Sequence, residues 1–447
     1  MNTTATVAFG GERGGEAALT WGQRHVWRAL PRHGRGRYFL NCPWVAPVYG
    51  KRDLSEVLDA LRRLIERHES LRTIFADTPS GPVQRVARRG ELVVGLEDAG
   101  EDRPLERAQR IADEMSKVIF APEDEWPLRC RVVLSAGRPA ALAFAFSHLA
   151  VDHVALGLLG ADWRRLLRGE ELPPAGWHPM DQVELEATPR YLARSARSVQ
   201  FWRSALERVP LDLFDHPPGQ PEDPRYIEVT MESAALTAAA RLLAQRWASS
   251  TSGVLLAACA TALATLSGRA QAVMSLVHSN RRDPRTGAMI GTAMQDSLFV
   301  LDLRDGGLAA TCRAAGRGAL EAYKNTQYDP FAMWAMREEI GSRRGRKPDL
   351  DAFFNDRPGP GGWPELPVST AAEVAQLAGK TRIQAGLSWP EIDIRVMFYL
   401  GTAHGVGQLS LIADTAYLPR GTVTSMLLGV ETLLVRSLSE EPAALIR

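Results

Sequence analysis

An almost uninterrupted apolar stretch, residues 140–146, is the feature of this sequence that most constrains its fold. A strand without polar alternation is covered on both faces, which is typical of a sheet flanked by helices. Helical spacing of apolar residues follows this stretch over 156–167 and precedes it over 54–64. The earlier helix has a capping-box start, with Asp53 followed three residues later by Glu56. These patterns predict an α/β fold.

The second half of the chain repeats the alternation of helices and strands. Apolar spacing predicts helices over 191–206, 234–247, 252–266 and 422–438, and strands over 272–278, 298–303, 392–399 and 408–414. The segment Gly169–Met180 is rich in Pro, Gly and Glu and predicts a boundary between the halves. We therefore expect two lobes of similar kind, residues 1–175 and 176–447.

The charge balance excludes several functional classes. Lys and Arg total 53 and Asp and Glu total 52, a net charge of +1 over 447 residues. A general nucleic-acid or membrane-surface role is not expected, because neither polyanion would attract this chain at long range.

The four cysteines form no CxxC pair, which argues against a zinc site or disulfide scaffold and fits a reducing compartment. With no secretory leader and no apolar run of about 18 residues, we expect a cytoplasmic protein.

The heptad Ser147–His153, directly after the apolar strand, is the best candidate for chemistry. It places His148 and Asp152 four residues apart. A neutral imidazole suits general-base catalysis near neutral pH, and a nearby carboxylate can orient it. The spacing alone also allows a buried structural histidine. Metal ligation by His148, Asp152 and His153 is a weaker alternative, because adjacent side chains diverge on a helix or a strand.

Motifs of other enzyme classes are missing. The sequence has no GxxxxGK[ST] loop, no GxGxxG after a strand and no GxSxG elbow. An ATPase, a dinucleotide-dependent enzyme and a serine hydrolase are therefore disfavoured.

The heptad resembles the HHxxxDG motif of nonribosomal peptide synthetase condensation domains, which belong with chloramphenicol acetyltransferase. Other segments resemble further motifs of that family in the same order. Residues 19–30 are similar to S/T-x-x-Q-x-R-L-W-x-L, Arg67–Phe75 closely matches RHExLRTxF, residues 281–291 keep the spacing of GRxxPxxxxxxG, and residues 323–331 resemble H-x-x-x-P-F. The likeness runs from about residue 19 to about residue 440.

The resemblance implies two chloramphenicol acetyltransferase-like lobes in a V-shaped pseudo-dimer with a tunnel between them. It also implies an acyl or aminoacyl donor on the phosphopantetheine arm of a carrier protein. Transfer to an amine or hydroxyl acceptor, small or carrier-bound, would form an amide or ester in natural-product biosynthesis. With no adenylation or carrier segment in the 447 residues, we expect a stand-alone monomer that acts on its carrier protein in trans. No metal or redox cofactor is implied, and the phosphopantetheine belongs to the partner.

The family motif suggests a role for each matching residue. His148 stands where the family's base or intermediate-stabilising histidine stands. Asp152 stands where the motif aspartate forms a salt bridge with an arginine, for which Arg281 is the first choice and Arg72 the second. His68, inside the RHExLRTxF match, is expected to support the lobe together with Arg72.

Two positions depart from the motif. Ser147 replaces the first histidine, and His153 replaces a glycine that lets a backbone N–H approach the reacting carbonyl. His153 can narrow the acceptor side, abolish catalysis or add a proton-transfer group. We assign His148, Asp152 and His153 to the catalytic set, and Ser147 and Arg281 to substrate binding.

Two other functions remain open. A condensation-like domain with a degenerate motif can serve as a recruitment module that binds carrier proteins without catalysis. The second is a CoA-dependent acyltransferase acting on a soluble small molecule. The DFGWG signature of the plant-type branch is absent, which counts against one form of it.

Overall fold

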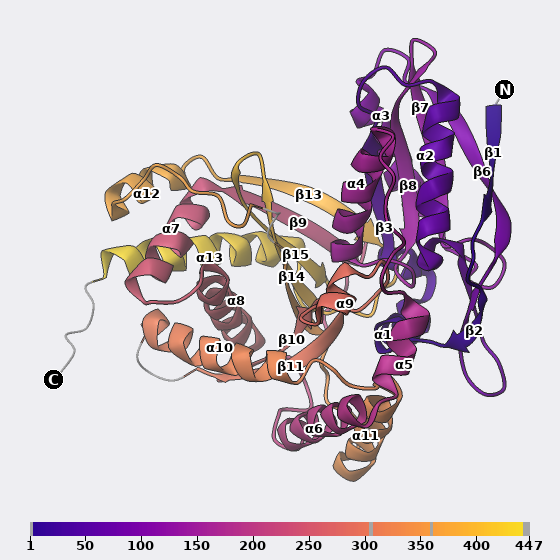
Figure 1. Cartoon of the computed structure of the whole chain (residues 1–447). Coiled ribbons are helices and arrows are strands. Elements are labelled where there is room, and N and C mark those ends of the chain that lie inside the picture. The colour runs from indigo at the N-terminus through magenta and orange to yellow at the C-terminus, as the bar shows by residue number, and fades with distance from the viewer. Residues whose placement is uncertain (1–2, 304–306, 358–360, 441–447) are drawn as a thin grey trace. The chain divides into compact units, whose positions relative to one another are not determined.

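The computed structural model describes residues 3–303, 307–357 and 361–440 and confirms the α/β class (Figure 1). These residues cluster into two compact units. Unit 1 contains the described residues of Met1–Ala193, Ser279–Gln295 and Asp329–Phe331. Unit 2 contains those of Arg194–His278, Asp296–Tyr328 and Ala332–Arg447.

Unit 1 is built around a five-stranded sheet of order β1-β6-β7-β8-β3. Its elements are β1 (Thr3–Gly10), β2 (Gly15–Ala18), α1 (Trp21–Ala29), η1 (Leu30–Leu40), β3 (Asn41–Pro47), α2 (Leu54–Arg67), η2 (Glu69–Arg72), β4 (Thr73–Ala76), β5 (Val83–Val86), β6 (Arg89–Asp98), α3 (Pro104–Ser116), β7 (Leu128–Ser135), β8 (Arg138–Ser147), α4 (His153–Leu167), α5 (Pro179–Glu186) and the short α9 (Pro284–Ala288). Strands β2, β5 and β4 form a separate three-stranded sheet.

Strand β8 is covered on both faces, as the apolar stretch predicts. Phe144 and Phe146 pack in one buried cluster with residues of α2 and α4, while Ala143 and Ala145 pack in another with residues of α3. Figure 1 shows α2, α3 and α4 beside β7 and β8. Full burial of each phenylalanine contributes about 1.5–3 kcal/mol. The strand that leads to the Ser147–His153 heptad is therefore firmly held.

Unit 2 contains a seven-stranded sheet of order β11-β10-β12-β14-β15-β9-β13. Its elements are β9 (Tyr226–Ser233), α7 (Ala234–Arg246), α8 (Thr251–Ser267), β10 (Gln271–His278), β11 (Gln295–Asp302), α10 (Gly307–Lys324), α11 (Pro330–Arg344), β12 (Ala352–Asp356), α12 (Ala371–Ala378), β13 (Arg382–Trp389), β14 (Val396–Ala403), β15 (Val406–Asp414) and α13 (Arg420–Ser439), and α6 (Pro189–Leu206) runs into it from unit 1. Its apolar core joins α7, α8, α10 and α13 to the sheet.

No single helix among the described residues has the length and apolar character needed to cross a membrane. Helices α7 and α8 meet those criteria only as a pair, and the pair is bent by 110°.

The compact units divide the chain at residues other than the expected 175/176 boundary. Residues 176–193 and 279–295 lie in unit 1, where some of their charged side chains form ion pairs. Asp181 pairs with Arg13 at 2.7 Å, and Arg281 pairs with Asp152 at 2.8 Å. The Pro- and Gly-rich composition of Gly169–Met180 thus marks a loop within unit 1.

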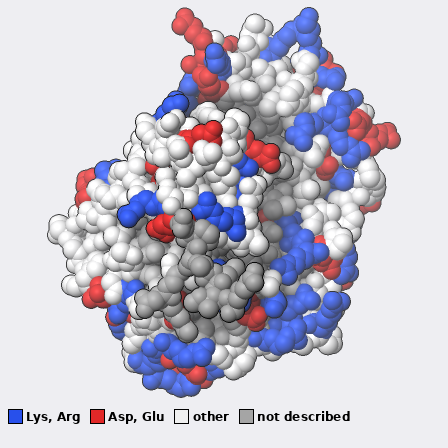
Figure 2. All heavy atoms as spheres, turned by 90° about the vertical axis from the view of Figure 1, so that its left-hand side faces the viewer, with Lys and Arg blue, Asp and Glu red and all other residues white. Residues whose placement is uncertain are grey.

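The surface agrees with the near-zero net charge. On the face shown in Figure 2, both Lys and Arg side chains and Asp and Glu side chains are exposed, and they lie side by side in several places. Exposed pairs of this kind, such as Arg62–Asp59 at 2.6 Å, contribute little to stability.

Candidate functional site

The Ser147–His153 heptad forms a tight connection between a strand and a helix. Strand β8 ends at Ser147 and helix α4 begins at His153, with Asp152 as its N-cap residue. The N–H of Ala150 donates to the carbonyl of Ser147 at 3.0 Å, and Leu149 is fully buried. Packing and hydrogen bonding therefore fix the backbone on both sides of His148.

Asp152 is buried, and all its lone-pair directions are used within unit 1. Its side chain is 4% exposed and forms an ion pair with Arg281, whose side chain is 5% exposed. The predicted Asp152–Arg281 pair is thus confirmed, and the second choice, Arg72, lies elsewhere. The carboxylate also accepts hydrogen bonds from the N–H groups of Ala155, at 2.9 Å, and Ala293, at 3.1 Å. An Asp152 so occupied acts as a structural group, which argues against its place in the catalytic set.

Arg281 also has its hydrogen-bonding capacity filled. Its Nε and one Nη2 hydrogen point to Asp152, at 3.3 and 2.8 Å. The remaining N–H groups donate to the main-chain carbonyls of Thr286, Met289 and Gly291, at 2.7–2.8 Å. Because a guanidinium has five N–H donors, none remains for a substrate in this conformation. The geometry supports a bracing role for Arg281 in place of the predicted substrate-binding role.

His148 is partly buried, and its backbone is held from two directions. Its N–H donates to the carbonyl of Leu40 at 3.2 Å, and its carbonyl accepts a hydrogen bond from the hydroxyl of Thr292. The segments that end η1 and precede β11 therefore hold the main chain from which the imidazole projects. This arrangement is compatible with the predicted base, and the catalytic role of His148 stays a prediction.

The two residues that depart from the family motif lie in different environments. Ser147 is 6% exposed, and its Oγ accepts a hydrogen bond from the N–H of Leu149 at 3.4 Å, so its hydroxyl serves the turn. His153 is exposed in the first turn of α4. An exposed His153 can meet a reactant, whereas the buried Ser147 hydroxyl faces the local backbone. The substrate-binding role of Ser147 and the catalytic role of His153 stay predictions.

The two predicted supporting residues are buried and hydrogen-bonded. The Nε2 atom of His68 lies 2.9 Å from Asp162 in α4. Burial lowers the pKa of His68, although its contact with Asp162 opposes this. Arg72 is 2% exposed and donates to the carbonyls of Arg13 and Ala87, at 2.7 and 2.5 Å. Burial likewise lowers the pKa of Arg72, and the charge of Glu69 opposes that effect.

Further polar residues around the site were not anticipated from the sequence. Gln182 and Glu186 of α5 are buried and hydrogen-bonded to each other at 3.0 Å, and Gln182 accepts a hydrogen bond from Thr286 at 2.9 Å. Burial raises the pKa of Glu186 to about 8, although the hydrogen bonds from Gln182 and the Trp21 N–H oppose the shift. The only available signal was indirect, because Thr286 lies inside the GRxxPxxxxxxG-like segment.

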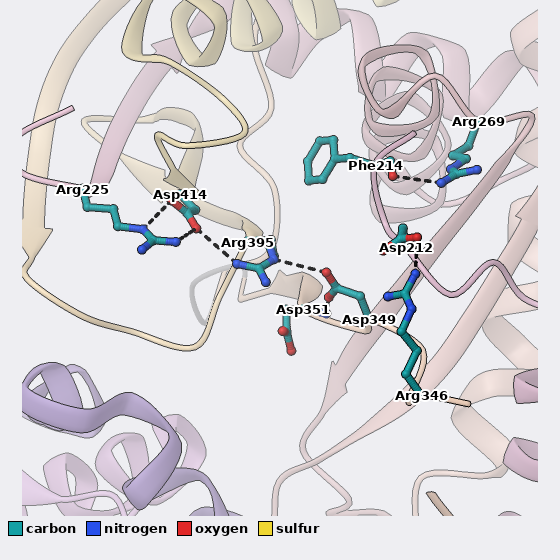
Figure 3. Close-up of polar contacts among 9 residues, drawn as sticks. All are labelled: Asp212, Phe214, Arg225, Arg269, Arg346, Asp349, Asp351, Arg395 and Asp414. Atoms are coloured by element: carbon teal, nitrogen blue, oxygen red, sulfur yellow. Dashed lines mark hydrogen bonds and ion pairs between the residues drawn. The ribbon is translucent and has the colours of Figure 1, made fainter. Parts of the chain in front are cut away.

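Unit 2 has a separate polar network at the ends of β9, β14 and β15. Asp414 is fully buried and accepts paired hydrogen bonds from Arg225, at 2.9 and 2.8 Å. Arg395 donates to Asp414 at 3.2 Å and to Asp349 at 3.1 Å, and Figure 3 shows it between these two carboxylates. The paired charges tie together loops that precede or follow strands of one sheet. The arrangement is that of a structural brace.

The described residues were also compared with the ligand sets that bind metal ions. Within the described part of the chain, no group of three or more His, Cys, Asp or Glu side chains is placed to hold a metal ion.

Comparison with known proteins gives consistent matches. A family model described as "Condensation domain" matches residues 14–300. Bacitracin synthase 3 of Bacillus licheniformis is 24% identical over 359 residues, which cover 76% of this chain and 6% of that protein. The structure of SgcC5 from Streptomyces globisporus has a TM-score of 0.72 at 16% identity, over 95% of this chain and 99% of that one. The X-domain from teicoplanin biosynthesis has a TM-score of 0.72 at 18% identity, over 96% of each chain.

Proposed function

Because this chain belongs to the condensation-domain family, we propose that it transfers an acyl or aminoacyl group from a carrier-protein phosphopantetheine thioester to an amine or hydroxyl acceptor. The product is an amide or ester of a natural-product pathway. The chain spans only 6% of the length of the bacitracin synthase that it matches, so donor, acceptor and carrier protein are part of the proposal.

The observation that carries this proposal is the support of His148 within unit 1. A buried ion pair holds Asp152 at the start of α4, and a hydrogen bond from Thr292 holds the carbonyl of His148. A base that must meet an acceptor proton within hydrogen-bond reach requires a fixed position. Burying the charges of Asp152 and Arg281 costs free energy of solvation. A catalytic His148 gives a reason for that cost, because the buried pair helps to fix its position.

In the proposed reaction, the acceptor nitrogen or oxygen attacks the thioester carbonyl carbon. The new C–N or C–O bond forms, the C–S bond breaks, and the phosphopantetheine thiol leaves with one proton. His148 takes the proton from the attacking group, or stabilises the charged tetrahedral intermediate. No redox cofactor enters this balance.

An intact-mass assay of a loaded carrier protein tests the proposal. We expect loss of acyl mass from the carrier and appearance of the acylated acceptor with the native chain. His148→Ala should lose most turnover at an unchanged melting temperature. His216→Ala, which removes an exposed imidazole from unit 2, should keep it. Wild-type turnover by a folded His148→Ala variant would remove His148 from the chemistry.

The acceptor and donor panels should be broad. The SgcC5 structure is described as a complex with an aryl-substituted ethanediol, which is a reason to include diols beside amines. Acyl-CoA without carrier protein forms the second donor arm. Turnover in that arm alone would favour the CoA-dependent alternative.

A second candidate function rests on Ser147 and His153, which replace the family histidine and glycine. They favour a recruitment module that binds a carrier protein and leaves its cargo unchanged. The likeness to the teicoplanin X-domain shows the shared fold and does not decide between the two functions. Saturable carrier binding, measured by calorimetry, together with no product across the donor panel would select this candidate.

A further inference from the structure

Gln182 is a buried polar residue just after the segment Gly169–Met180, whose composition predicts a boundary. Its side chain lies in α5 and is 5% exposed. Its amide makes three hydrogen bonds: Oε1 accepts from Trp177 Nε1, at 3.1 Å, and from Thr286 Oγ1, at 2.9 Å, while Nε2 donates to Glu186 at 3.0 Å. Three hydrogen bonds to one buried amide give the glutamine side chain a specific orientation.

The orientation of the amide follows from the chemistry of its neighbours. The indole N–H of Trp177 is a donor only, so the group that faces it must be the carbonyl oxygen of Gln182. The same oxygen then receives the hydroxyl of Thr286, and the amide nitrogen faces Glu186. The hydroxyl proton of Thr286 is thereby directed toward α5.

Thr286 connects Gln182 to the candidate site. While its hydroxyl donates to Gln182, its main-chain carbonyl accepts from Nη1 of Arg281 at 2.8 Å. Arg281 in turn holds Asp152 at 2.8 Å. A few residues later, Thr292 donates to the carbonyl of His148. All these groups belong to unit 1.

We propose that Gln182 is a positioning residue for His148, which acts by fixing Thr286 and, through it, the segment that braces Asp152 and the His148 carbonyl. This proposal rests on the proposed function only for its kinetic readout. The physical cause is that Thr286 is anchored on two sides. Loss of the Gln182 anchor leaves a buried hydroxyl and an indole N–H without partners, so the local backbone must shift to satisfy them.

Two isosteric variants and one control test the proposal. Gln182→Met removes the amide, and Thr286→Val removes the hydroxyl that it receives. The control is Gln84→Met, because Gln84 is also buried and its side chain is hydrogen-bonded outside the 281–293 segment, accepting from Gln23 at 3.3 Å and donating to Ala18 at 2.9 Å. Thr286→Ser keeps the hydroxyl and serves as the conservative rescue.

The kinetic expectation is a change in kcat at nearly constant KM. Gln182→Met and Thr286→Val should each lower kcat by roughly tenfold to a hundredfold, because small displacements of a catalytic group carry that cost. The double variant should be no slower than the slower single variant, since both remove the same anchor. Gln84→Met and Thr286→Ser should retain kcat within about twofold of the native value.

A second readout does not need activity. In histidine-labelled protein, the His148 imidazole signal can be assigned by its loss in His148→Ala, and its titration midpoint followed by NMR. We expect the midpoint to move in Gln182→Met and Thr286→Val and to stay in place in Gln84→Met. If the native chain is inactive and the midpoint moves, the positioning role stands and the proposed function fails. An unmoved midpoint in both variants, or equal changes in the Gln84 control, would overturn the positioning role, and Thr286→Val decides the test if Gln182→Met does not fold.

Discussion

Asp152→Asn should destabilise the protein by about 3 kcal/mol, the upper end of the range for single substitutions. The change keeps the size of the side chain, removes the charge and replaces one acceptor oxygen with an NH2 group that faces N–H donors. Asparagine caps helices about as well as aspartate does, so the start of α4 need not be lost. What is lost is the charge opposite Arg281, in a pair whose two side chains are 4% and 5% exposed.

The size of the effect follows from that burial. Removing one partner of a buried ion pair costs about 3–5 kcal/mol, because the remaining charge is left without compensation. Arg281 keeps its three main-chain carbonyl contacts, which offset part of that cost, so the lower end of the range, about 3 kcal/mol, is expected. Against a typical stability of about 5–15 kcal/mol, such a loss is easily measured.

Urea unfolding followed by circular dichroism is a suitable assay. The matched control is Asp59→Asn, because Asp59 pairs with Arg62 across an exposed helix face, with side chains 51% and 39% exposed. That change should cost less than about 1 kcal/mol. Equal unfolding free energies for the two variants would refute the view that the Asp152–Arg281 pair is an essential brace. Arg281→Met should be at least as damaging as Asp152→Asn, since it also leaves three buried carbonyls without donors.

Three further predictions concern α1, α4 and α5. Gly22→Ala should destabilise by about 1–3 kcal/mol in thermal melts, because the added Cβ would lie 2.2 Å from the carbonyl oxygen of Thr292; a stabilising effect, as expected for alanine in an uncrowded helix, would contradict this. His153→Gly should lower KM for bulky acceptors and cost under about 1 kcal/mol of stability, and an unchanged KM would mean that the imidazole does not narrow the acceptor side. The raised pKa of Glu186, about 8, keeps its proton bound in the folded state while the unfolded state, with a pKa near ~4.3, has released it. This contribution to the free energy of unfolding is complete below pH ~4.3 and is lost as pH rises toward 8, by up to ~1.4 kcal/mol per pH unit. Glu186→Gln should therefore flatten the plot of unfolding free energy against pH between pH 5 and 8. Parallel plots for the native protein and the variant would show that the buried carboxyl is not the cause of the pH dependence.

The buried helices and strands of the fold were predictable from the sequence, because their patterns of apolar residues are long. The apolar stretch at 140–146 predicted a strand covered on both faces, and Asp53 with Glu56 forms the expected capping box at the start of α2. The edge strands β3 and β13 were missed for physical reasons. Strand β3 contains two prolines, which argue against a strand in a sheet interior and are tolerated at an edge. Strand β13 is mostly exposed, so no buried face imposes an apolar alternation on it.

In the candidate site, the sequence predicted an ion pair between two side chains but not the hydrogen bonds from side chains to the main chain. The family motif singled out Asp152 and Arg281, and their ion pair is present. Most of the remaining contacts of Arg281 are with main-chain carbonyls, which any residue type provides, so no sequence pattern announces them. Gln182 was hidden for a different reason. It lies just after a run of Pro and Gly, and local composition cannot reveal a partner more than a hundred residues away.

Residues 279–295 belong to unit 1, although the chain on either side of them belongs to unit 2, and this limits how the protein can be divided into fragments. The segment leaves from β10 and returns to β11, neighbouring strands of the unit 2 sheet. A gene fragment ending at residue 193 would encode the carboxylate of Asp152 without its guanidinium, and the complementary fragment would carry the guanidinium alone. Because each piece would lack one partner of this buried ion pair, we expect neither to fold stably alone and the two units to melt in a single transition. Shuffling one half of the chain between homologues would require Arg281 and its surrounding loop to travel with the opposite half.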